Sequence, residues 1–141
     1  MSKSSHALYQ ITTKALIRRG SKVLVLYRPN GAIDFPGGRI DESERSLDWT
    51  SSLQREVTEE LGRDISIIIG KILFVGKRSY EHNGSTHHVA TLFYDCDYVD
   101  GNVALSSEHV GFEWLDLSEL QTTDKTFVST DEQQHIRTLQ A

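Results

Sequence analysis

The 141-residue sequence has few of the residues that cross-link or divide a chain, with one cysteine and two prolines. A single cysteine cannot form an internal disulfide, and Cys96 lies in an alternating segment, so we interpret it as a small core residue. The prolines, Pro29 and Pro36, do not mark a linker, and the sequence contains no tandem repeat. One folded domain covering residues 1–141 is therefore expected.

Long apolar runs and a basic excess are missing as well. The longest apolar runs, residues 23–27 and 65–69, are far shorter than the roughly 20 residues of a membrane-spanning helix, so no membrane span is expected. Residues 1–10 lack the apolar stretch of a signal peptide, and we expect a cytoplasmic location. The net charge of −5 argues against binding duplex nucleic acid, while small phosphorylated ligands remain compatible with it.

What the sequence does contain is a series of segments with strand patterning, either alternating apolar and polar residues or rich in β-branched residues. The predicted strands cover residues 8–18, 22–28, 32–35, 65–75, 89–98 and 112–115. Gly20 favours a tight turn between the first two strands, and Asn83 with Gly84 favours a hairpin. Pro36 and the two glycines that follow it predict that a loop begins there.

Two segments are predicted to be helices. Residues 46–61 have Ser46 and Asp48 suited to the first turn and Gly62 suited to the C-cap. Residues 129–139 have Ser129 or Thr130 as the candidate cap. Apolar residues recur every four positions in the first helix, at Leu53, Val57 and Leu61. This order of strands and helices predicts an α/β fold, an α/β/α sandwich with a mixed β-sheet.

The first helix also carries three glutamates on one face, Glu56, Glu59 and Glu60. Like charges at this spacing destabilise an isolated helix by roughly 0.2 to 0.5 kcal/mol per pair. One interpretation is a site for a hard divalent cation such as Mg²⁺, which prefers oxygen ligands. The other is a solvated acidic face, which is common on surface helices.

The surroundings of this helix resemble the Nudix box of the Nudix hydrolase superfamily. Residues 55–62 read Arg-Glu-Val-Thr-Glu-Glu-Leu-Gly, and Gly38 and Glu44 match the first spacing of the box. The sequence departs from the pattern in two places. Ten residues instead of seven separate Glu44 from Arg55, and Arg63 replaces an aliphatic residue. We interpret the three extra residues as an insertion in the loop or an early helical turn, remote from the glutamates near the helix end.

The resemblance implies a Nudix fold and Mg²⁺-dependent hydrolysis of a diphosphate linkage in a nucleoside diphosphate derivative, with Mn²⁺ as an alternative metal. The substrate would be a nucleoside triphosphate, a modified nucleotide or a dinucleoside polyphosphate. The metal ligands implied by position are Gly37 through its carbonyl, Glu56, Glu59 and Glu60. Arg55 resembles the arginine that orients a glutamate, and Glu108 or Glu59 is the candidate general base.

Other residues are candidates for substrate binding. Arg28 and Arg39 flank the glycine pair, where the planar guanidinium suits phosphate oxygens. Tyr80 lies where dinucleoside-polyphosphate hydrolases of the family carry a tyrosine, and it could stack on a base. The sequence leaves open a non-catalytic module that binds a nucleotide or an RNA end, and it leaves open a homodimer.

Overall fold

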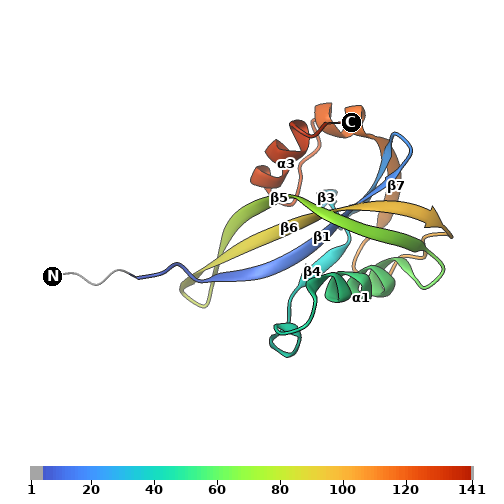
Figure 1. Ribbon diagram of the computed structural model, residues 1–141. Helices are drawn as coiled ribbons and strands as arrows, with labels where there is room; N and C mark the ends of the chain where they lie inside the picture. Colours follow the sequence, from blue (N-terminus) through green and yellow to red (C-terminus); the bar gives the residue numbers. More distant parts are fainter. Residues whose placement is uncertain (1–4, 141) are drawn as a thin grey trace.

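A computed structural model describes residues 5–140, which form one β-sheet with helices on both faces (Figure 1). Residues 1–4 and 141 of the predicted domain lie outside the described residues. The strands are β1 (Tyr9–Arg19), β2 (Lys22–Tyr27), β3 (Ile33–Asp34), β4 (Gly37–Arg39), β5 (Ser66–His82), β6 (Ser85–Asp100) and β7 (Gly111–Asp116). The helices are η1 (Glu42–Glu44), α1 (Trp49–Leu61), α2 (Leu117–Thr122) and α3 (Thr130–Arg137).

Strand β1 lies at the centre of the sheet and has partners of both orientations. It runs parallel to β6 along most of its length and antiparallel to β4 and to β2 on its other side. The turn at Gly20 joins β1 to β2 as predicted, but the two strands pair only next to the turn. β4 takes the place beside the first half of β1, so the sheet is mixed, as the sequence predicted.

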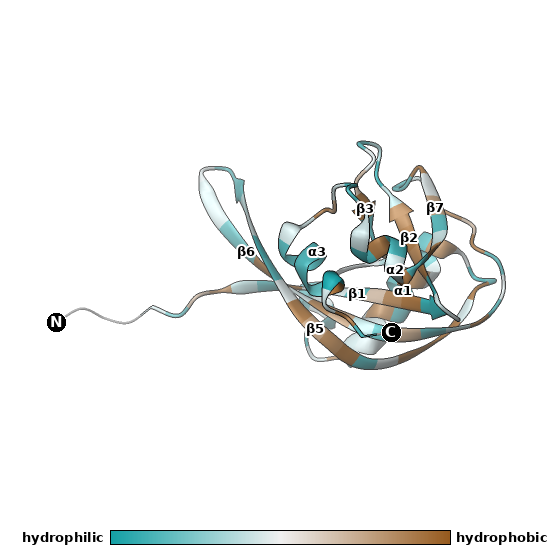
Figure 2. Cartoon of the chain, turned by 90° about the horizontal axis from the view of Figure 1, so that it is seen from above, coloured by the Kyte–Doolittle hydropathy of each residue, from teal (hydrophilic) through white to brown (hydrophobic). Residues whose placement is uncertain are grey.

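Each face of the sheet packs against its own hydrophobic core. Along β1, Ala15 and Ile17 pack in the core that contains α1, whereas Leu16 packs in the core that contains α2 and α3. This division follows from the two-residue period of a strand. Apolar segments run along the central parts of the strands, beneath the helices (Figure 2). The predicted α/β/α sandwich is therefore confirmed.

Helix α1 begins three residues later than predicted, because Asp48 is its N-cap and accepts a hydrogen bond from the Thr50 amide. Gly62 ends the helix at a φ of 90°, as the sequence predicted. Residues 45–48 lie between η1 and α1, within the stretch that is longer than the Nudix box pattern. Leu53, Val57 and Leu61 are fully buried, and each contributes about 1.5 to 3 kcal/mol to stability.

The hairpin of β5 and β6 is longer than the sequence predicted. Its turn is formed by Asn83 and Gly84, which both have positive φ as a tight hairpin turn requires. The part of the hairpin next to the turn is rich in polar residues. These residues are extended because each strand pairs with the other, so apolar patterning does not reveal them. Within residues 5–140, no group of three His, Cys, Asp or Glu side chains is arranged to hold a metal ion. His82, His87 and His88, which lie in this hairpin, therefore form no such site.

Other differences from the sequence prediction are short elements. The expected loop after Pro36 is instead strand β4, which pairs with β1, and the six-residue helix α2 was not predicted. Helix α3 is shorter than predicted at its carboxyl end, and Ser129 caps it. Cys96 is 1% exposed, as expected for a core residue, and burial raises the pKa of its thiol to about 12. No helix in the described part of the chain is long and apolar enough to cross a membrane.

Candidate active site

The glutamates of α1 lie beside the apolar stripe that anchors the helix to the sheet. Because Val57 and Leu61 point into the core, their neighbour Glu60 is carried inward with them and is only 3% exposed. Glu56 is half-buried and Glu59 is exposed. The predicted acidic cluster therefore spans the boundary between the core and solvent.

The glycine pair faces these carboxylates. Gly37 and Gly38 lie opposite Lys14 and Thr13 in the β4–β1 ladder. The Gly37 amide donates a hydrogen bond to Glu60 Oε2 at 3.4 Å. A Cβ atom on Gly38 would come within 2.5 Å of the Glu56 carboxylate. Glycine is required here because the backbone of β4 approaches the acidic side chains so closely.

Arg55 connects the acidic residues to one another. Its guanidinium donates to both carboxylate oxygens of Glu44, at 3.2 and 3.0 Å, and also to Glu56 at 3.2 Å and Glu59 at 2.9 Å. The hydrogen bonds to Glu44 and Glu59 raise the pKa of Arg55 above its usual range, and the hydrogen bond from Arg55 lowers the pKa of Glu44. Arg55 therefore contacts three glutamates, and its role in orienting one of them for the reaction stays a prediction.

The two inner carboxylates are protonated more readily than ordinary glutamates. Burial is the main cause that raises the pKa of Glu60 to about 7, against the lowering effect of Lys14 and His109. Burial also raises the pKa of Glu56, and the nearby charges of Glu59 and Glu108 raise it further. Both residues would be more stable as anions beside a cation.

These residues fit the divalent cation that the sequence implies. Glu56 and Glu60 supply hard oxygen donors, and each has a pKa that a neighbouring cation would lower. Glu59 is held by Arg55 and is turned to solvent, so the described side chains do not already gather as a set of three. The site would need the ion itself to draw the third carboxylate inward.

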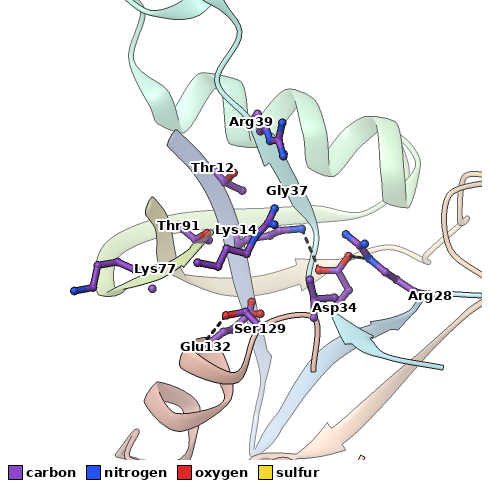
Figure 3. Close-up of a pocket in the computed structure, with 14 residues that line it drawn as sticks. Thr12, Lys14, Arg28, Asp34, Gly37, Arg39, Lys77, Thr91, Ser129 and Glu132 are labelled. Carbon is purple, nitrogen blue, oxygen red and sulfur yellow. Dashed lines mark hydrogen bonds and ion pairs between the residues drawn. The ribbon is translucent and has the colours of Figure 1, made fainter. Parts of the chain in front are cut away.

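A buried polar network that sequence reasoning missed lies on the other side of the glycine pair. Asp34 is 1% exposed and contacts Lys14 and Arg28, each at 3.1 Å (Figure 3). It also contacts His109 at 3.1 Å. Burial raises the pKa of Asp34, but these partners and the Phe35 amide outweigh it and hold the pKa well below its usual range. Lys14 was the one visible signal, as a charged residue within an apolar strand.

A pocket of about 200 Å³ adjoins this network (Figure 3). It contains both predicted phosphate-binding residues, Arg28 and Arg39. The basic residues in its wall are Lys14, Arg28, Arg39, Lys77 and Arg78. The pocket is therefore suited to an anionic group close to the acidic end of α1.

Tyr80 lies next to this pocket without lining it. The Arg39 guanidinium lies 5.0 Å from the Tyr80 ring centroid, and the His87 ring stacks on Tyr80 at 5.2 Å. The ring thus already has partners in the protein. Stacking of Tyr80 on a substrate base stays a prediction.

Glu108, the first candidate for the general base, is exposed in the segment between β6 and β7. The Ser106 amide, two residues before it, donates to the Glu60 carbonyl at 3.0 Å, so this segment lies beside the end of α1. The charge of Glu108 also raises the pKa of Glu56. Sequence reasoning missed a second acidic residue, Glu132 in the first turn of α3, which lines the basic pocket. Burial raises the pKa of Glu132 to about 8. Nothing in the local pattern distinguishes Glu132 from an ordinary first-turn glutamate.

Comparisons with known proteins agree with this geometry. A family model of the NUDIX domain matches residues 8–136. The MutT protein from Methanosarcina mazei Go1 is similar in structure, with 26% identity and a TM-score of 0.73, over 95% of this chain and 94% of that chain. No curated protein matches the chain.

Two more distant structures share the fold. The MutT NUDIX hydrolase from Burkholderia pseudomallei has 18% identity and a TM-score of 0.71, over 94% of this chain and 99% of that chain. An ADP-ribose pyrophosphatase from Streptococcus suis 89-1591 has 19% identity and a TM-score of 0.65, over 92% and 89%. The chain belongs to the NUDIX domain family, a family of hydrolases that act on phosphorus-containing anhydrides.

Proposed function

We propose that this protein is a Mg²⁺-dependent pyrophosphohydrolase that cleaves a diphosphate linkage in a nucleoside diphosphate derivative. The candidate substrates are a nucleoside triphosphate, a modified nucleotide and a dinucleoside polyphosphate, and Mn²⁺ is an alternative metal. One observation carries the proposal: the inner carboxylates Glu56 and Glu60 face the glycine pair next to a basic pocket. A metal-bound diphosphate needs both kinds of surface.

The cation would be held by Glu56 and Glu60, with Glu59 and the Gly37 carbonyl as further ligands. When bound, it would neutralise charge on the phosphate oxygens and make a bound water more acidic. Arg55 contributes by fixing the Glu56 side chain through a contact of 3.2 Å. The glycine pair contributes by leaving room for that carboxylate.

The reaction also requires a group that accepts a proton from the attacking water. Glu108 is our first choice for two reasons. Within residues 5–140 it has no ion pair that would hold its carboxylate, and its charge raises the pKa of Glu56. Glu59 is the second choice, since its carboxylate is bound by Arg55 at 2.9 Å. Of the two, Glu108 needs to break fewer contacts to act.

The substrate phosphates would contact the basic pocket. Arg39 is exposed, and its guanidinium is held over Tyr80, which limits the orientations available to it. Arg28 is half fixed, because its Nε binds Asp34 at 3.1 Å while 47% of its side chain stays exposed. Both can therefore offer free N–H donors to an anion.

The rival proposal is a non-catalytic module that binds a nucleotide or an RNA end. Two departures from the Nudix box favour it, namely the three inserted residues and Arg63. Against it stands the Glu44–Arg55 ion pair, which is made across the inserted segment. All three helix glutamates are also retained in the sequence. We therefore favour the enzyme.

The test is a nucleotide panel incubated with the purified protein and Mg²⁺, with release of phosphate and pyrophosphate as the measurement. Activity that needs the metal and is removed by EDTA is the expected result. Running the reaction in oxygen-18 water would show which phosphorus is attacked. Absence of product from every nucleotide at high protein concentration, combined with measurable nucleotide binding, would favour the rival.

A further inference from the structure

Asp34 is a buried junction at the end of β3 that uses both of its carboxylate oxygens. Oδ1 accepts from Lys14 Nζ at 3.1 Å and from the Phe35 amide at 2.8 Å. Oδ2 accepts from Arg28 Nε at 3.1 Å and from His109 Nε2 at 3.1 Å. A carboxylate that is 1% exposed and bound on both oxygens has a fixed orientation. Its partners are fixed by it in turn.

His109 is the partner that connects Asp34 to a distant part of the chain. It follows Glu108 in the segment between β6 and β7, and it is 9% exposed. Since Asp34 is an anion that can only accept, His109 Nε2 carries the proton of this hydrogen bond. In the part of the chain that the structure describes, its other ring nitrogen is buried without a partner. The bond to Asp34 is thus the polar contact that holds the ring.

The same segment has backbone anchors on either side of Glu108. The Ser106 amide donates to the Glu60 carbonyl at 3.0 Å, and the Val110 amide donates to the Tyr27 carbonyl at 2.9 Å. Between these two anchors, the side chain of His109 reaches inward while that of Glu108 is exposed. Glu108 therefore lies directly beside a buried side chain, within a short stretch that is held at both ends.

We propose that Asp34 acts through His109 to position Glu108 for the reaction. The proposal rests on the proposed function, because it gives Glu108 the role of general base. Asp34 and His109 are positioning residues and touch no reacting atom. The same carboxylate orients Lys14 and Arg28 in the pocket, so one buried anion organises both the phosphate-binding side and the base side of the site.

The test compares two replacements of His109 that differ in one property. His109→Gln supplies an amide N–H donor near the place of Nε2, whereas His109→Met has a similar length and no donor. His109→Met should lower kcat roughly 10-fold or more with KM within about 2-fold, and His109→Gln should stay close to wild type. Glu108→Gln should lower kcat about 100-fold. Combining His109→Met with Glu108→Gln should cause no further loss.

Hydrogen exchange of residues 104–110 gives a readout that does not need activity. Exchange should be faster in His109→Met than in wild type and His109→Gln, at a similar melting temperature. If His109→Met does not fold, His109→Asn is the second variant, because its shorter amide cannot reach Asp34. Equal exchange and equal kcat in all these proteins would overturn the inference, and so would additive losses in the double variant. If the wild type has no activity and His109→Met still exchanges faster than the wild type, the proposed function is rejected while the contact between His109 and Asp34 is supported.

Discussion

Glu44 and Arg55 form a two-pronged ion pair across ten intervening residues, with Nε to Oε2 at 3.2 Å and Nη2 to Oε1 at 3.0 Å. The pair joins η1 to the middle of α1, so the segment between them closes as a loop. The stretch that contains the three additional residues is therefore closed at its base by an ion pair. The planar fork of arginine is what allows both bonds to form at once.

The pair predicts a difference between two conservative replacements. Arg55→Lys keeps the charge but cannot bind both oxygens of Glu44 and reach Glu59 as well, so we expect activity to fall about 10-fold. Arg63→Lys is the matched control, because Arg63 is exposed beyond the helix C-cap and should retain full activity. The measurement is kcat/KM on the best substrate of the panel. Equal activity of the two variants would show that the fork does not matter.

Glu60→Gln should remove turnover while preserving the fold. The amide of glutamine has nearly the same shape as the carboxyl group. It carries no charge, so it removes the cost of burying a carboxylate, a cost that raises the pKa of Glu60 to about 7. The change removes a proposed metal ligand, so kcat should fall on the order of 100-fold or more, with nucleotide affinity largely retained. Glu119→Gln, on the exposed face of α2, is the control. A Glu60→Gln variant with wild-type turnover would remove Glu60 from the metal site.

The two adjacent glycines should respond differently to alanine. A Cβ on Gly38 meets the movable carboxylate of Glu56 at 2.5 Å, so Gly38→Ala should fold yet lose Mg²⁺-dependent activity. A Cβ on Gly37 meets the backbone carbonyl of Thr13 at a φ of 145°, so Gly37→Ala should lower the melting temperature by several degrees or prevent folding. Thermal melts and activity assays separate these outcomes. Full activity of Gly38→Ala would contradict the close approach of the Gly38 backbone to the Glu56 carboxylate.

The stability of the metal-free protein should fall as the pH rises from about 4.5 to 8. Folding raises the pKa of Glu60 from 4.5 to about 7 and that of Glu132 from 4.5 to about 8, so the folded state binds more protons over this interval. For Glu60 the loss is on the order of 3 kcal/mol. The lowered pKa of Asp34 acts in the opposite direction and removes stability as the pH falls below its ordinary value of 3.8.

Thermal melts in EDTA and in Mg²⁺ over this pH range test the expectation. Mg²⁺ should raise the melting temperature more at about pH 8 than at about pH 5, because the ion favours the ionised form of Glu60. Glu132→Gln should flatten the pH dependence in EDTA, and Glu119→Gln should leave it unchanged. An identical pH profile for wild type and Glu132→Gln would contradict the assignment of a raised pKa.

Much of the fold follows from local patterns. The period of four in α1 and the stop at Gly62 depend on residues close together in sequence, and the structure confirms both. The predicted start at Ser46 lies three residues before the observed one, because Asp48 is the N-cap. Strand β4 was not predictable in this way. Its three residues are small or charged, and they are extended because Thr13 and Lys14 on β1 offer them partners.

The candidate site divides along the same line. Residues 55–62 by themselves determine that three glutamates share one helix face next to an arginine, because a helix fixes the spacing of its own side chains. Only the tertiary structure decides that Asp34, Lys14 and His109 meet beside Glu60, since they come from β3, β1 and the segment before β7. Their contacts join residues that are 20 to 75 positions apart in the sequence, and a local periodic pattern cannot predict contacts over such separations.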